Sequence, residues 1–227
     1  MAGTTQRILV VNPNSNEAVT RGIDAALEPL RFAGGPQIAC ATLAVGPFGI
    51  ETQADVESVA MPLRRLVEGD NEADAFVIAC YSDPGLHVCR EATERPVFGI
   101  AECGVLTALA EGDRFGVIAI KSRSIPRHMR YLRQMGLTDR LAGERALEMS
   151  VAETASGEGT LDRMTEVGLA LKEKDGAGVI VMGCAGMAAH RGPLSERLGI
   201  PVVDPTQAAV TMALGRVALA RAAAIAG

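Results

Sequence analysis

The sequence predicts an α/β fold made of two similar halves, each with a parallel β-sheet covered by helices. Fully apolar, β-rich runs alternate with amphipathic helical patterns along the chain, which is typical of parallel sheets with helices on both faces. The chain also resembles itself. A run that begins at Arg7 leads to Ser15, and a similar run that begins at Arg114 leads to Ser122. The second arginine and the second serine each lie 107 residues after the first (114 − 7 and 122 − 15).

A second internal match includes two cysteines. The run from Phe76 to Cys80 resembles the run from Val179 to Cys184, and the two cysteines lie 104 residues apart (184 − 80). A Pro-Val pair then follows each cysteine at a similar distance. Together the two matches favour two half-size α/β units over one doubly wound sheet.

The expected elements of the first half follow from its apolar patterns. After the first strand, Asn14 or Ser15 is the expected N-cap of a helix, and Glu17 takes the place of the acidic residue in a capping box. Gly46 to Gly49 should form a loop. The other expected elements are strands at 7–11, 38–44, 76–79 and 97–100, and helices at 52–67 and near 103–111.

The second half repeats this alternation. Its expected helix at 124–136 places Ile125, Met129 and Leu132 inward and ends at Gly136, which suits a C-terminal cap. The other expected elements are strands at 115–120, 149–152 and 179–182, a helix at 160–174, and a last helix from about 205 towards the C-terminus.

The composition excludes several classes of protein. Of 227 residues, 48% are apolar and 22% charged, which suits a globular protein with a sizeable core. The net charge of −5 and the lack of a basic stripe make nucleic acid an unexpected partner. No apolar run approaches the roughly 18 residues that span a bilayer, and no signal segment is visible, so we expect neither membrane insertion nor export. Five cysteines without regular spacing argue against a disulfide framework and favour the cytoplasm.

Cys80 and Cys184 are the strongest candidates for chemistry. Each follows an apolar strand and precedes a small turn that contains glycine. Ligands of open α/β sheets bind beyond the carboxyl ends of the strands. Free backbone N–H groups and the start of the next helix should lower the pKa of a thiol at this place and favour the thiolate. A cysteine can also be a simple core residue, but two in matching positions favour function.

The other candidates are weaker. We interpret the remaining three cysteines as packing residues, and the isolated histidines with no Cys-x-x-Cys pair predict no metal site. Neither a Walker loop nor a dinucleotide fingerprint is present, so no nucleotide cofactor is expected. Ser122, beside Lys121 and Arg123 beyond a strand, either holds an anion at a helix N-terminus or is an ordinary N-cap.

Five motifs, taken together, resemble a known family. The chain resembles the hydantoin racemase branch of the aspartate/glutamate racemase superfamily, which includes allantoin racemases. The segments that carry the resemblance keep the family's order and are Asn12-Pro13-Asn14-Ser15, Gly46-Pro47-Phe48-Gly49-Ile50-Glu51, Ala79-Cys80-Tyr81-Ser82-Asp83-Pro84-Gly85-Leu86, Gly99-Ile100-Ala101-Glu102 and Gly183-Cys184-Ala185-Gly186-Met187.

The resemblance implies a fold and an arrangement of the site. It implies two pseudo-symmetric, flavodoxin-like α/β halves, with the active site in the cleft between them and the two cysteines facing each other. It also implies no metal, no organic cofactor and a C-terminal helix that returns to the first half. We therefore expect residues 1–103 with 206–227 to form one half and residues 104–205 the other, in a homo-oligomer.

Departures from the family pattern bear on the substrate. Free amino-acid racemases of the superfamily usually carry Asn-Thr after the first cysteine and Thr after the second. In this chain Tyr81-Ser82 follows the first cysteine and Ala185-Gly186 follows the second, which argues against aspartate or glutamate as the substrate. Arylmalonate decarboxylases keep one of the two cysteines, whereas this chain keeps both. Hydantoin racemases most often have Phe where this chain has Tyr81, so the choice between a hydantoin and allantoin stays open.

The expected reaction is racemisation at a carbon next to a carbonyl. Such a reaction needs two acid/base groups on opposite faces of the carbon, and thiols suit this role because their pKa can be tuned. We assign Cys80 and Cys184 to it, with an enolate intermediate stabilised by backbone N–H groups. The residues expected to contact a hydantoin-like ring or its substituent are Asn14, Phe48, Ile50, Tyr81, Ser82, Ser122, Gly183, Ala185 and Gly186.

Two other classes remain open at this point. One is a cofactor-free isomerase or decarboxylase that uses one cysteine as base or nucleophile and the other as acid. The other is a non-catalytic small-molecule sensor on the same cleft, against which the retained cysteine pair argues.

Overall fold

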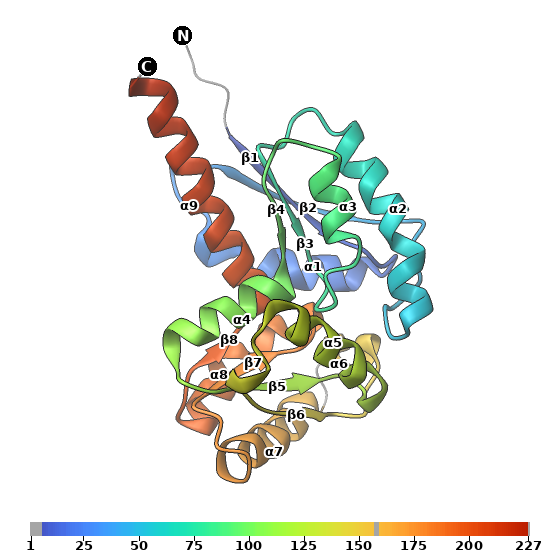
Figure 1. Cartoon of the computed structure of the whole chain (residues 1–227), viewed down its shortest axis with the longest axis vertical. Coiled ribbons are helices and arrows are strands. Elements are labelled where there is room, and N and C mark those ends of the chain that lie inside the picture. Colours follow the sequence, from blue (N-terminus) through green and yellow to red (C-terminus); the bar gives the residue numbers. More distant parts are fainter. Residues whose placement is uncertain (1–5, 157–158, 227) are drawn as a thin grey trace.

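The computed structural model describes residues 6–156 and 159–226 and contains two four-stranded parallel sheets with helices on their faces (Figure 1). This confirms the predicted fold class. The first sheet has the order β2-β1-β3-β4, from β1 (Arg7–Asn12), β2 (Gln37–Thr42), β3 (Ala75–Ile78) and β4 (Val97–Gly99). The second has the order β6-β5-β7-β8, from β5 (Phe115–Ala119), β6 (Leu141–Ala146), β7 (Val179–Met182) and β8 (Val202–Val203).

The register of the strands matches the internal repeat of the sequence. In the first sheet Ile8 pairs with Ala75, and in the second Phe115 pairs with Val179. Phe115 lies 107 residues after Ile8, and Val179 lies 104 residues after Ala75 (115 − 8 and 179 − 75). These are the same offsets as in the sequence repeat. The two halves therefore place their third strands, and the cysteines that follow them, in equivalent positions.

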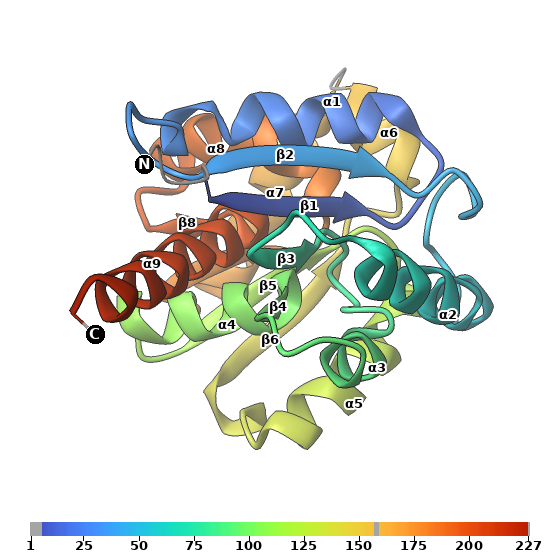
Figure 2. The same ribbon diagram turned by 90° about the horizontal axis from the view of Figure 1, so that it is seen from above.

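Helices cover both faces of the first sheet (Figure 2). Alternate side chains of β1 point to opposite faces, so Ile8 and Val10 pack with α1 (Glu17–Ala26), while Leu9 and Val11 pack with α2 (Gln53–Gly69). The short helix α3 (Leu86–Glu91) lies beside α2. Thr52 is the N-cap of α2 and forms a capping box with Asp55.

The helices of the second half and the last helix complete the layers. These are α4 (Ile100–Glu111), α5 (Ile125–Met135), α6 (Val151–Ser156), α7 (Thr160–Glu173), α8 (Arg191–Leu198) and α9 (Pro205–Ala226). Helix α7 packs on β5 and β6, and α9 returns to pack on α4, β1 and β3 (Figures 1 and 2). In the part of the chain that the structure describes, no helix is long and apolar enough to cross a membrane.

The structure corrects two local predictions. The N-cap of α1 is Asn16, whose side chain accepts from the N–H of Ala18, because Asn14 accepts the N–H of Asn16 and closes the preceding turn. The strand expected at 149–152 is also wrong. Ser150 and Glu153 exchange side-chain to backbone hydrogen bonds at the start of α6, which is a capping box.

Two strands were not predicted, β6 and β8, and both lie at the edges of the second sheet. Strand β6 is the longer of the two. All six of its residues are only partly buried, and Glu144 and Arg145 interrupt its apolar pattern. An edge strand with charged residues gives a weak sequence signal. The division of the chain at 103/104 stays a prediction; helix α4 crosses that point, and α9 begins at Pro205.

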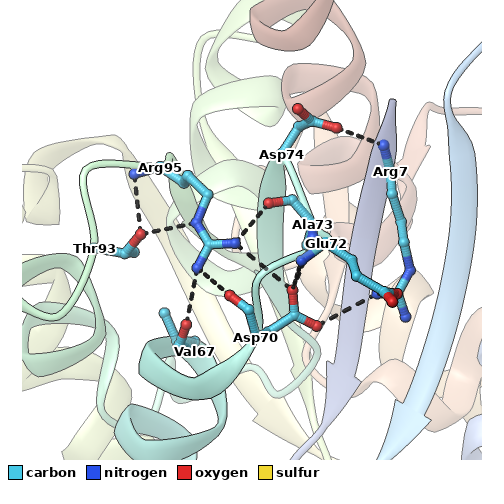
Figure 3. Close-up of polar contacts among 8 residues, drawn as sticks. All are labelled: Arg7, Val67, Asp70, Glu72, Ala73, Asp74, Thr93 and Arg95. Atoms are coloured by element: carbon cyan, nitrogen blue, oxygen red, sulfur yellow. Dashed lines mark hydrogen bonds and ion pairs between the residues drawn. The ribbon is translucent and has the colours of Figure 1, made fainter. Parts of the chain in front are cut away.

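Arg95 ties together the segments at the amino ends of the first sheet (Figure 3). Its guanidinium donates to the carbonyls of Val67, Asp70 and Ala73 at 3.1, 2.5 and 2.8 Å and stacks 4.7 Å from the centre of the Phe76 ring. The network thus connects the end of α2, the turn before β3 and the turn before β4. It lies at the edge opposite to the carboxyl ends of the strands.

Candidate active site

A pocket lies where the carboxyl ends of the two sheets meet. Cys80 comes two residues after β3 and Cys184 two residues after β7, and both line this pocket. The lining residues come from both halves of the chain. The repeated fold therefore brings the two sequence-predicted cysteines to one site.

Backbone N–H groups contact both sulfurs. The N–H of Ser82 donates to the Cys80 sulfur, and the N–H of Gly186 donates to the Cys184 sulfur. The Thr154 hydroxyl donates to the Val151 carbonyl at 2.8 Å. The two thiols also lie close enough for the charge of one to raise the pKa of the other. Cys80 is half-buried and Cys184 is 9% exposed.

The expectation of lowered thiol pKa values is wrong for this structure. Burial raises the pKa of Cys80 to about 12, and the Ser82 N–H and the Arg127 guanidinium offset only part of this effect. Burial likewise raises the pKa of Cys184. Removing a thiolate from water costs more free energy than these donors return, so both groups are thiols near neutral pH. All five cysteines lie in the described part of the chain and are free.

Most of the other predicted site residues line the pocket. The structure brings together around the two sulfurs Asn14, Ile50, Tyr81, Ser82, Gly183, Ala185 and Gly186. Two residues lie elsewhere. Phe48 is 65% exposed and does not line the pocket, because its loop buries Ile50 instead. Ser122 is exposed and donates its backbone N–H to Glu148, in a separate surface hollow.

Helix α5 supplies residues that the sequence analysis missed. Arg127 is half-buried, lines the pocket, and donates from Nε to the Ser82 hydroxyl at 2.9 Å. Ser124 and His128 line the pocket as well. The predicted inward face of this helix contained Ile125, Met129 and Leu132. Of these Leu132 is buried, and the other buried residue of the helix is His128. The signal that could have found Arg127 is its place in the first turn of a helix that follows a strand end.

A buried contact between a histidine and a carboxyl group lies at the wall of the pocket. His128 Nδ1 lies 2.5 Å from Glu144 Oε1, and the side chains are 6% and 1% exposed. The ring of Tyr81 meets the ring of His128 edge to face, with centroids 5.2 Å apart. This contact fixes Tyr81, which follows Cys80 in the chain, against the second half. Tyr81 is therefore a wall of the pocket rather than an exposed ligand.

Asp83 anchors the turn after Cys80. It has a left-handed backbone, with a φ of 42°, and its carboxylate accepts the N–H groups of Ala101 and Glu102 at the start of α4, both at 2.9 Å. Gly99 makes this possible, since a Cβ there would lie 2.3 Å from the carboxyl group. Burial outweighs these hydrogen bonds and raises the pKa of Asp83 to about 7.

Glu51 joins the two halves beside the pocket. Its Oε2 lies 2.6 Å from Arg123 and 3.5 Å from Lys121, and its Oε1 accepts the N–H of Val151 at 3.2 Å. Glu51 precedes α2 in the first half, while its three partners belong to the second. These contacts hold the halves together over the pocket.

The arrangement suits proton transfer by protein groups. Across residues 6–156 and 159–226, no three His, Cys, Asp or Glu side chains are placed to hold a metal ion together. What the pocket does contain is a pair of thiols, backbone N–H groups, a guanidinium and aliphatic walls. When two cysteines contact one bound molecule, a thiolate can remove a proton from a carbon and a thiol can deliver a proton to the same carbon.

Comparisons with known proteins agree with this arrangement. The family model described as Asp/Glu/Hydantoin racemase matches residues 8–213. A hydantoin racemase of Paenarthrobacter aurescens is 37% identical over 218 residues, which cover 94% of this chain and 92% of that protein. A hydantoin racemase of a Pseudomonas species is 35% identical, with coverage of 91% and 84%.

Solved structures give the same result. An allantoin racemase from Klebsiella pneumoniae superposes with a TM-score of 0.89 at 33% identity and covers 95% of this chain and 89% of its own. An allantoin racemase from Pseudomonas fluorescens gives a TM-score of 0.87 at 31% identity, with coverage of 95% and 92%.

The fold, the pocket and these relatives define an enzyme of the isomerase class, a racemase. The chain belongs to the Asp/Glu/hydantoin racemase family.

Proposed function

We propose that this racemase inverts the chiral carbon of a 5-substituted hydantoin or of allantoin, using Cys80 and Cys184 as its two acid/base groups and no cofactor. The observation that carries the proposal is that the two thiols, one from each half, line a single pocket. The relatives add support for the substrate class, since they are hydantoin and allantoin racemases.

The proposed reaction is a proton transfer across the ring. One cysteine first loses its proton to solvent, which happens in a small fraction of the enzyme at neutral pH. The thiolate then takes the proton from the ring carbon that carries the substituent. The electron pair of the broken C–H bond moves into the neighbouring ring carbonyl and forms an enolate. The other cysteine, as thiol, gives its proton to the opposite face of the carbon, and the electron pair returns. The enzyme then holds the thiolate on the other side, ready for the reverse reaction.

The lining of the pocket fits a small neutral ring. Val19, Ile50 and Val151 supply aliphatic surface, while Ser82, Ser124 and backbone groups supply hydrogen-bonding partners for ring N–H and carbonyl groups. Asn14 is less available, because its Oδ1 accepts from the N–H of Asn16 and from the Asn12 amide. We expect Asn14 to shape the turn at the rim of the pocket.

Replacing each cysteine singly by alanine tests the two-base mechanism. Inversion should collapse in both variants, because it needs an acid and a base. The remaining thiolate can still remove the proton that faces it and return a solvent proton to the same face. In heavy water, Cys80→Ala should therefore exchange the ring proton of one enantiomer only, and Cys184→Ala that of the other.

Proton NMR of each pure enantiomer measures this preference, and Cys89→Ala is the matched control because Cys89 is buried away from the pocket. Exchange of the same enantiomer by both variants would contradict the mechanism, as would near-parental racemisation by Cys184→Ala. Release of CO2 from a carboxylated substrate without racemisation would favour a decarboxylase instead.

A further inference from the structure

Arg127 brings a positive charge to the pocket, and the carboxylates that act on it, Glu144 and Asp55, do so from beyond ion-pair distance. Only Nε has a hydrogen-bond partner, the Ser82 hydroxyl, and in the described part of the chain no carboxylate lies within 4 Å of the guanidinium. A partly buried charge without a partner costs free energy. Such a group at a pocket wall is typical of a site where the ligand supplies the partner.

Two nearby arginines, one in the turn before α5 and one on α5, have their partners outside the pocket. Arg123 pairs with Glu51, and Arg130 donates to Gln53 Oε1 at 2.7 Å, so both bridge the two halves outside the pocket. Arg127 also reaches across the halves, from α5 to Ser82. It alone of the three lines the pocket, with its two terminal nitrogens available.

The enolate oxygen needs donors besides the N–H groups that act on the two sulfurs. The N–H groups of Ser82 and Gly186, which follow the two cysteines, donate to the sulfurs themselves. These N–H groups favour the thiolates, so a charged side chain at the pocket wall is the candidate donor to the ring oxygen. Arg127 lies on the Cys80 side of the same pocket, since its positive charge acts on the Cys80 thiol.

We propose that Arg127 is a third catalytic residue, whose terminal N–H groups donate to the ring oxygen that becomes the enolate oxygen. This inference rests on the proposed function. When a cysteine thiolate removes the ring proton, the electron pair of the C–H bond moves onto that oxygen, and the guanidinium faces the new negative charge. Arg127 itself neither gains nor loses a proton. Ser82 positions it, and does so only when the two halves are together.

Donation to the ring oxygen and recognition of an anionic substituent lead to different expected results. Donation to the ring oxygen stabilises the transition state of every substrate, whatever its substituent. Recognition of a carboxylate on the substituent would instead matter only for substrates that carry one. A neutral and an anionic substrate therefore separate the two roles.

The test measures kcat and KM for Arg127→Gln, Arg127→Lys and the wild type on 5-isopropylhydantoin and 5-carboxymethylhydantoin. For Arg127→Gln we expect kcat to fall on the order of 100-fold on both substrates, with KM changed much less, as when an oxyanion donor is lost. Arg127→Lys should recover part of kcat, because it keeps the charge and loses the planar fork. Arg130→Gln is the matched control, since it removes a neighbouring contact between the halves outside the pocket.

Proton exchange in heavy water gives a second readout. Because both enantiomers form the same enolate, Arg127→Gln should slow exchange of both equally, unlike the single cysteine variants. A kcat for Arg127→Gln within threefold of the wild type on 5-isopropylhydantoin would overturn the inference. So would a loss confined to 5-carboxymethylhydantoin, or an equal loss in Arg130→Gln. Failure of the wild type to racemise any hydantoin or allantoin would instead contradict the proposed function itself.

Discussion

Two opposing effects determine the pKa of each thiol in the pocket. The N–H of Ser82 and the charge of Arg127 favour the Cys80 thiolate, whereas burial disfavours it more strongly and raises the pKa to about 12. Cys184 is subject to the same competition. A thiol with a raised pKa is neutral at pH 7 and becomes reactive as the pH increases. The pH dependence of thiol reactivity should therefore reflect the burial of the sulfur.

Alkylation of the enzyme by iodoacetamide should depend steeply on pH. The thiolate is the reactive form, so the rate of inactivation should rise roughly tenfold per pH unit between pH 7 and pH 9, without reaching a plateau. Mass spectrometry of the Cys80 peptide identifies the modified residue, and substrate should slow the modification. An inactivation rate that is constant between pH 6 and pH 9 would show instead that the thiolate is already formed.

Among the secondary-structure elements, Arg95 joins three segments that lie far from the pocket. Its guanidinium donates to carbonyls at the end of α2 and before β3 (Figure 3). Because Arg95 itself precedes β4, these hydrogen bonds connect β4 to the other two segments. Asp70 belongs to the same network. Burial alone would raise the pKa of Asp70, but the N–H groups of Ala73 and Glu72 and the charges of Arg7 and Arg95 hold it below its usual range.

Arg95→Ala should lower the free energy of unfolding by about 3 kcal/mol, because several buried carbonyls lose a charged donor. Arg95→Lys should lose less, since it keeps one charge but cannot reach three carbonyls in a plane. Urea denaturation measures both. Arg64→Ala is the control, because its exposed pair with Glu68 is worth about 0.5 kcal/mol or less. Equal losses for Arg95→Ala and Arg64→Ala would contradict this interpretation.

Across the whole molecule, the halves meet through a small number of polar side chains around the pocket. Glu51 pairs with Arg123 and Lys121, Gln53 accepts from Arg130, and Ser82 accepts from Arg127. Helices α4 and α9 pack against each other at the far side of the pocket from these contacts. The polar contacts beside the pocket are partly exposed, so salt should screen them.

Glu51→Gln should raise KM about two- to fivefold at low salt, since each partly exposed pair is worth roughly 0.2–1 kcal/mol. The wild-type KM should increase with sodium chloride and approach that of the variant, whose own KM should change little. Glu68→Gln is a suitable control, because Glu68 pairs only within α2. The interpretation fails if Glu51→Gln and the wild type have the same KM at low salt.

The sequence predicted the parts of the molecule that depend on local patterns. Apolar runs identified β1, β3, β5 and β7, and the repeat placed Cys80 and Cys184 at equivalent strand ends. It did not predict β6 or the cap of α6, where charged residues mask the apolar pattern. Nor did it predict Arg127, because a basic residue on an amphipathic helix usually faces water, and only the approach of the two halves encloses this one.

The equivalent placement of the cysteines has a kinetic consequence. Two mirror-image substrates have equal free energies in water, so the ratio kcat/KM must be the same in both directions of the reaction. The two halves differ, however, in how deeply each sulfur is buried and which groups contact it. Those differences can appear only as compensating changes, in which the direction with the larger kcat also has the larger KM. The structural asymmetry of the site thus sets how tightly each mirror image is held, and leaves no preference for one over the other at equilibrium.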